Sequence, residues 1–185
     1  MAWSRHANEQ QLLETVPVGA RWPDQQELGG VFLNDASGSK IGYYIDQSIE
    51  VRTTQCTDGT VAAQEVTLTL THTFDGDVAA MPDYVSGGGV YVPEGQFSTN
   101  VVYYPPAHLD VLGVTIDGEP ALFSRDIHHT RHVGAVRAAV DPGDTVVITW
   151  STRGEAVGRA RGVVWTPLAR NTTEELLTDV SVDAC

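Results

Sequence analysis

The chain has 185 residues, of which 42% are hydrophobic and 19% charged, an ordinary composition for a globular protein. Its formal net charge of −13 argues against nucleic acid and against an anionic membrane surface, because both are bound through basic surfaces. The simplest interpretation of this charge is solubility. No apolar run approaches the ~20 residues of a membrane span, and the opening residues lack the apolar core of a signal peptide. We therefore expect no membrane contact by this segment itself.

The first predicted element is a short helix over Ala7–Glu14, where good helix formers precede the helix-breaking Pro17 and Gly19. An irregular stretch follows, and a brief strand is predicted at Val31–Leu33. We interpret residues 1–29 as an N-terminal helical appendage.

The longest regular pattern runs from Ile41 to Phe74 and predicts a β-hairpin. Its apolar residues alternate with polar ones on both sides of Asp58-Gly59, a dipeptide that favours a two-residue type I′ turn. With that turn, Thr57 lies opposite Thr60 and Val51 lies opposite Val66. A slip by one residue would turn every apolar side chain to the wrong face, so the turn and the pattern support each other. The alternating positions on the predicted inner face are Tyr43, Ile45, Ile49, Val51, Val66, Leu68 and Leu70.

On the opposite face of this hairpin, the same register pairs Arg52 with Glu65 and Asp46 with Thr71. We interpret both as cross-strand surface pairs and not as a catalytic set.

The stretch from Asp75 to Gln96 is the longest without a regular pattern. Loops longer than about 12–15 residues are commonly functional or mobile. We therefore predict a contact loop here, with Asp75, Asp77, Asp83 and Tyr84 as its contact residues. A crossover between two sheets is the structural alternative. The acidic residues do not have the spacing of an EF-hand loop, and we predict no metal site.

Three further strands are predicted at Phe97–Tyr104, Leu109–Ile116 and Glu119–Ser124, and a second Asp-Gly turn at Asp117-Gly118 joins the last two. That turn places Val114 opposite Ala121.

A third hairpin is predicted around the turn Asp141–Asp144, with Val140 opposite Val146. The last predicted strand pair joins Gly162–Trp165 to Asp179–Val182, with a helical turn at Thr173–Leu177 between them.

Some nine or ten short strands with hairpin turns and almost no helix predict an all-β fold. We expect an antiparallel β-sandwich of the immunoglobulin-like Greek-key type, with a short N-terminal helix. Residues 30–185 would form this single domain.

The two cysteines, Cys56 and Cys185, allow one internal disulfide. Closing a loop of that length would contribute about 4–5 kcal/mol in the chain-entropy model. Spacing alone does not distinguish a bridge from two thiols, because the redox compartment decides between them.

The densest titratable cluster is the run from His128 to His132, which also contains His129. On an extended strand, successive same-side residues lie about 6.5–7 Å apart, so His128 and His132 could not chelate one ion. No nucleophile motif is present. We predict no catalytic residue and no cofactor. A hydrolase using His128, His129 or His132 with Asp126 is a remote alternative.

Carbohydrate binding is another alternative. Exposed tyrosines can stack against sugar rings, and Tyr84, Tyr91 and Tyr103 are the candidates. This hypothesis describes a carbohydrate- or wall-polymer-binding module.

Several segments together resemble a known family: Leu28–Asp35, Gly38–Tyr44, Met81–Val85, Val102–Pro105 and Asp141–Asp144. They are similar to the C-terminal part of a domain-of-unknown-function family (number 4012) in membrane-anchored envelope proteins of high-GC Gram-positive bacteria. The similarity extends to about Trp165, and its motifs are structural. It implies a piece of a longer, anchored protein whose β-rich part lies outside the cytoplasm in the cell envelope. It also implies that residues 1–29 are the tail of a missing upstream domain. We therefore expect a non-enzymatic extracytoplasmic module with a structural or binding role in that envelope. The upstream part of the same protein, or a cell-wall polymer, would be its partner.

Overall fold

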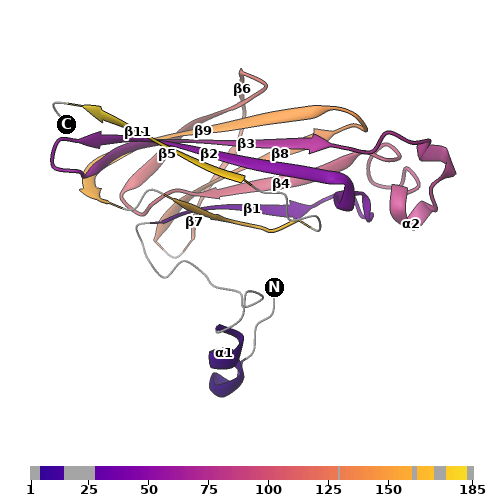
Figure 1. The fold of residues 1–185 in the computed structure, drawn as a ribbon, viewed down its shortest axis with the longest axis horizontal. Coiled ribbons are helices and arrows are strands. Elements are labelled where there is room, and N and C mark those ends of the chain that lie inside the picture. Colours follow the sequence, from indigo (N-terminus) through magenta and orange to yellow (C-terminus); the bar gives the residue numbers. More distant parts are fainter. Residues whose placement is uncertain (1–4, 15–27, 129, 160–161, 169–173, 183–185) are drawn as a thin grey trace.

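The computed structural model describes residues 5–14, 28–128, 130–159, 162–168 and 174–182. Two β-sheets pack face to face as a sandwich (Figure 1). The strands are β1 (Gly29–Asp35), β2 (Ile45–Cys56), β3 (Val61–His72), β4 (Phe97–Tyr104), β5 (Leu109–Ile116), β6 (Glu119–Ala121), β7 (Ser124–His128), β8 (Arg131–Val140), β9 (Thr145–Gly158), β10 (Val163–Trp165) and β11 (Glu174–Val182). The helical elements are α1 (Ala7–Glu14), η1 (Ile41–Tyr44), η2 (Val78–Ala80) and α2 (Asp83–Ser86).

The five-stranded sheet has the order β10-β1-β4-β8-β7, and the six-stranded sheet has the order β11-β2-β3-β9-β5-β6. The predicted β-sandwich and the helix at Ala7–Glu14 are confirmed. Two edge pairs, β1 with β10 and β2 with β11, are parallel, so the sheets are mixed and not purely antiparallel. None of the helices in the described ranges is long and apolar enough to cross a membrane.

The hairpin of β2 and β3 has the predicted register, with Val51 opposite Val66. Its turn is different. The Gly59 N–H donates to the Cys56 carbonyl and the Cys56 N–H donates to the Thr60 carbonyl, so Thr57 does not lie opposite Thr60. Within this turn only Gly59 has a positive φ, +81°. The loop is therefore the three-residue kind that ends in a left-handed glycine, and the predicted type I′ turn is wrong here.

A β-bulge explains why the register survives the longer turn. Gln55 lies opposite Val61 and Thr54 lies opposite Ala63, so Ala62 is one extra residue on β3. The bulge returns the apolar residues of β3 to the inner face, where Val66, Leu68 and Leu70 are fully buried. Burial of these apolar residues of β3 is therefore worth more than the preference of Asp58-Gly59 for a two-residue turn.

The hairpin also begins later than predicted. Ile41–Tyr44 form the 3-10 helix η1, and Tyr43 is 56% exposed, so its place on the inner face of a strand is wrong.

The predicted third hairpin is also wrong. Asp141–Asp144 does turn, with the Asp144 N–H donating to the Asp141 carbonyl, but β8 and β9 belong to different sheets. Val140 and Val146 both enter the core from opposite sides. Alternation alone does not tell strands that pair within a sheet from strands that face each other across a core. Within the described residues, the third hairpin is instead β7 with β8.

The final predicted strand pair is corrected in the same way. β10 pairs with β1 and β11 pairs with β2, in different sheets. Residues 174–177 are strand and not a helical turn, while Thr173 lies outside the described residues. The Asp117-Gly118 turn is confirmed: both residues have positive φ, 52° and 83°, and Val114 lies opposite Ala121.

A buried arginine ties one end of the five-stranded sheet together. Arg131 is 3% exposed, and its guanidinium donates to the backbone carbonyls of Leu28 and Pro105. Leu28 precedes β1 and Pro105 follows β4, so a single side chain of β8 holds three strands. Burial lowers the pKa of Arg131 from its ordinary value, and the neighbouring Tyr103 and Tyr104 act in the opposite direction.

Two strand glycines provide a matched test of the core. A Cβ on Gly134 would lie 2.5 Å from Cζ3 of Trp150, whereas a Cβ on Gly113 would meet nothing within 4 Å. We expect Gly134→Ala to lower the free energy of unfolding by about 1–3 kcal/mol through overpacking. Gly113→Ala should leave it unchanged or raise it by up to about 1 kcal/mol. Urea denaturation of both variants checks this. Equal stability of the two variants would contradict the packing described here.

Candidate functional site

Loops at one end of the sandwich enclose a groove of about 520 Å³, within the size range of small-molecule sites. Its walls come from the end of β1, the connection to η1, η1 itself and α2. We call it the end groove. It is lined by Asp35, Ser39, Lys40, Gly42, Tyr43, Tyr44 and Val85.

Hydrogen bonds from buried groups fix these walls. The buried Ser37 hydroxyl donates to the Ser98 carbonyl at 3.1 Å and accepts from the Ser98 N–H at 2.9 Å. Oδ1 of Asp35 accepts from the Ser37 N–H at 2.6 Å. The Lys40 N–H donates to the Val85 carbonyl at 3.2 Å, which joins the two sides. The groove is therefore preformed and does not need a ligand to assemble it.

An aromatic cluster supports one wall. The rings of Tyr43 and Tyr44 lie 5.2 Å apart at 87°, and those of Tyr44 and Phe74 lie 5.0 Å apart at 63°. These edge-to-face contacts are favourable. They hold the exposed ring of Tyr43 in a fixed orientation beside the groove.

The four predicted contact residues of the contact loop do not line the groove. Asp75, Asp77, Asp83 and Tyr84 are all exposed, and the side chain of Asp77 caps η2 by accepting from the Ala79 N–H at 3.1 Å. Only Val85 of this segment reaches the groove wall. Over the described ranges, no three His, Cys, Asp or Glu side chains are arranged to hold a metal ion.

Sequence reasoning missed the groove residues Asp35, Ser39, Lys40 and Tyr44, and it placed Tyr43 in a strand. The available signal was the turn-forming run Asp35–Gly42, which contains the only lysine of the chain.

His72 anchors the contact loop to the sandwich. It is buried, its Nε2 lies 3.0 Å from the Gly95 carbonyl, and the Phe74 N–H donates to its Nδ1 at 3.3 Å. Because Nδ1 accepts, the proton of the neutral ring is on Nε2 and is donated to Gly95. Burial lowers the pKa of His72 below its ordinary value, against the opposing effects of the Gly95 bond and the Asp141 charge.

The three candidate tyrosine platforms have different fates. Tyr84 and Tyr91 are 71% and 75% exposed, whereas Tyr103 is completely buried in the core. Its ring packs 5.7 Å from that of Trp150, and burial raises the pKa of its hydroxyl. The prediction of Tyr103 as a stacking platform is therefore wrong, because its strand position points inward.

The histidine run does not form one continuous strand, because β7 ends at His128 and β8 begins at Arg131. His128 ends β7, Thr130 has φ of 65°, and His128 lies opposite Arg131. His129 lies outside the described residues. His128 Nδ1 lies 3.0 Å from the Tyr104 hydroxyl, while His132 Nδ1 lies 3.0 Å from Asp110. The two histidines thus have separate partners.

A second hollow of about 340 Å³ is lined by Ser124, Asp126 and His128, among others. Ser124 and His128 are four residues apart on one strand, roughly 13 Å. That spacing is too long for a nucleophile and its base to share a hydrogen bond.

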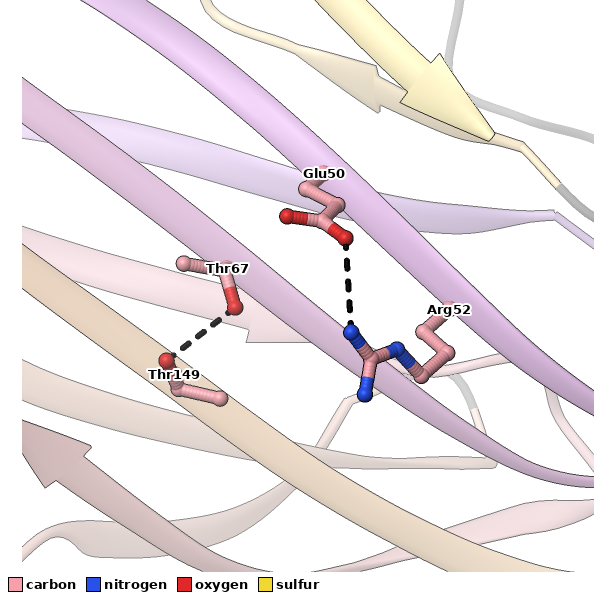
Figure 2. Close-up of polar contacts among 4 residues, drawn as sticks. All are labelled: Glu50, Arg52, Thr67 and Thr149. Carbon is pink, nitrogen blue, oxygen red and sulfur yellow. Dashed lines mark hydrogen bonds and ion pairs between the residues drawn. The ribbon is translucent and has the colours of Figure 1, made fainter. Parts of the chain in front are cut away.

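The outer face of the six-stranded sheet carries the predicted surface pairs. Figure 2 shows two polar contacts that form on this face, Arg52 with Glu50 and Thr67 with Thr149. Arg52 lies opposite Glu65 in register, yet its guanidinium contacts Glu50 on its own strand at 3.7 Å. The hydroxyls of Thr67 and Thr149 lie 3.1 Å apart across β3 and β9. The exposed ion pair between Arg52 and Glu50 contributes little to stability.

Cys56 is disulfide-bonded, and Cys185 lies outside the described residues. Val182, near the C-terminus, lies directly opposite Cys56 on the neighbouring strand. A bridge between Cys56 and Cys185 stays a prediction.

No protein-family model and no curated protein sequence matches the chain. Among solved structures, a proposed nutrient-binding protein from Legionella pneumophila is similar with a TM-score of 0.38 and 11% identity, over 68% of this chain and 43% of that protein. Yeast LTA4 hydrolase in complex with bestatin is similar with a TM-score of 0.32 and 13% identity, over 77% of this chain and 18% of the hydrolase. The chain thus spans less than half of either protein, and both likenesses are distant.

The buried His72 predicts a dependence of stability on pH. Because its pKa is lowered on folding from 6.5, unfolding takes up a proton below that pH, and the stability present above pH 6.5 falls as the pH decreases. We expect His72→Gln, which keeps a donor for Gly95, to weaken this dependence. His132→Gln, at an exposed position, should retain it. Urea titrations between about pH 5 and 7.5 measure the effect, and an unchanged slope in His72→Gln would contradict it.

Proposed function

We propose that this chain is a non-enzymatic, extracytoplasmic β-sandwich module with a binding role in the bacterial cell envelope. The observation that carries the proposal is the end groove, which is preformed and open and has an exposed aromatic ring beside polar side chains. The disulfide at Cys56 supports an oxidising compartment, since such bonds are rare in the cytosol. The resemblance to an envelope family supports the same location.

The ligand class that best suits the groove is a carbohydrate, such as a wall polymer. The Tyr43 ring offers an apolar face for the apolar side of a sugar ring. Asp35, Ser39 and Lys40 line the same groove and supply an acceptor and donors for sugar hydroxyls. The combination of one aromatic surface with a few polar groups is typical of pockets that fix a ligand's orientation.

Compartment is tested by mass spectrometry of the protein isolated from its native host without reductant. We expect neither Cys56 nor Cys185 to react with an alkylating reagent until the protein is reduced. Alkylation of both residues in unreduced protein would remove the support for export.

Glycan binding is tested by calorimetry with soluble wall oligosaccharides. Tyr43→Ala should weaken binding about three- to tenfold, as loss of one aromatic contact worth about 0.5–1.5 kcal/mol. Tyr84→Ala is the matched control, because Tyr84 is exposed at the same end but does not line the groove. Weaker binding by Tyr84→Ala, with unchanged binding by Tyr43→Ala, would show that the contact loop and not the groove binds the glycan. No binding by the unsubstituted protein would end the glycan proposal.

A further inference from the structure

The end groove lies in a strongly negative part of the surface. Turn Asp141–Asp144 lies at this end of the sandwich. Gln96 Nε2 of the contact loop donates to Asp141 at 2.9 Å, and the Gly143 N–H donates to the carbonyl of His72, the last residue of β3, at 3.0 Å. Lys40 is the only lysine of the chain. The exposed carboxylates on the loops of this end are Asp35, Asp75, Asp77, Asp83, Glu94, Asp141 and Asp144. Summed charge of one sign raises the local concentration of ligands of the opposite sign.

One of these carboxylates lies within the groove. Asp35 Oδ1 accepts from the Ser37 N–H, which fixes the side chain, and Oδ2 lies 3.9 Å from the position of a Cβ on Gly42. Gly42 and Tyr43 both line the groove and are adjacent in η1. An oriented carboxylate and the aromatic ring that the proposed sugar would contact therefore line the same groove.

We infer that the end groove takes a glycan that carries free amino groups. This inference rests on the proposed glycan binding and names its chemical class. The sugar ring packs on Tyr43, and its ammonium group donates to Asp35 in a charge-assisted hydrogen bond. Lys40, which has the same charge as the ligand, lies on the groove wall and opposes the ammonium, so the ligand's amino group lies on the Asp35 side.

Alternative ligands fit less well. An anionic glycan would meet a single ammonium, that of Lys40, within a field of carboxylates. A basic peptide would satisfy the charge but does not require the fixed ring of Tyr43. A neutral N-acetylated glycan would use the ring and leave the Asp35 carboxylate without an ionic partner from the ligand.

The experiment compares oligomers of glucosamine with N-acetylglucosamine oligomers of the same length, by calorimetry at a pH where the free amines are protonated. We expect the glucosamine oligomer to bind about tenfold more tightly at low salt, and this advantage to shrink in about 1 M salt through screening. Asp35→Asn should remove the advantage, so that the variant binds the two oligomers about equally. Asp75→Asn, an exposed carboxylate outside the groove, is the matched control and should change little. Lys40→Gln should tighten binding of the glucosamine oligomer.

The outcomes distinguish a preference for amino glycans from glycan binding in general. Equal binding of the two oligomers, equal effects of Asp35→Asn and Asp75→Asn, or weaker glucosamine binding in Lys40→Gln would overturn the inference while leaving glycan binding intact. Tight binding of trilysine that Tyr43→Ala does not weaken would replace the glycan by a basic peptide. Failure of both oligomers to bind would overturn the proposed function together with the inference.

Discussion

The contact on which the sandwich depends is the packing of Trp150 between the two sheets. Trp150 lies on β9 in the six-stranded sheet and is completely buried. Its indole packs against Tyr103 of β4 and lies over Gly134 of β8, both in the five-stranded sheet. It also contacts Phe123 edge to face, where the chain passes from β6 to β7. One large side chain therefore fixes how the sheets face each other, and the missing side chain at Gly134 provides the space.

The two ends of this sandwich have different roles. At one end, Arg131 donates to the carbonyls of Leu28 and Pro105 and so holds the ends of β1, β4 and β8. At the other end, His72 and Ser37 hold long loops against the strands. Loops on a rigid β scaffold are where binding residues commonly lie. The end groove occupies this second end, and buried polar groups that satisfy one another keep it open without a ligand.

The negative charge of the protein has one consequence over the whole surface and another around the end groove. A net charge of −13 spread over the whole surface would serve solubility alone. The carboxylates on the loops around the end groove concentrate part of it beside an oriented aromatic ring. In the proposed binding site, a ligand would be selected by sign of charge as well as by shape, and Lys40 would limit how close a cationic group can approach.

Most strands were predictable from the sequence, because alternation with period two is a local property that burial of one face imposes on each segment. Strand β7 was not, because all five of its residues are exposed and no alternating pattern marks it. The register of β2 with β3 was predictable for the same reason, even though its turn was not: the bulge at Ala62 restored what the three-residue loop at Gly59 displaced. Which strands are neighbours within a sheet depends on tertiary packing and could not be predicted from alternation. Val140 and Val146 have the pattern of a hairpin, yet they face each other across the core, since side-by-side pairing and face-to-face packing bury the same residues. The end groove also depends on tertiary packing, because Asp35, Tyr43 and Val85 come together there from three segments that no local sequence pattern connects.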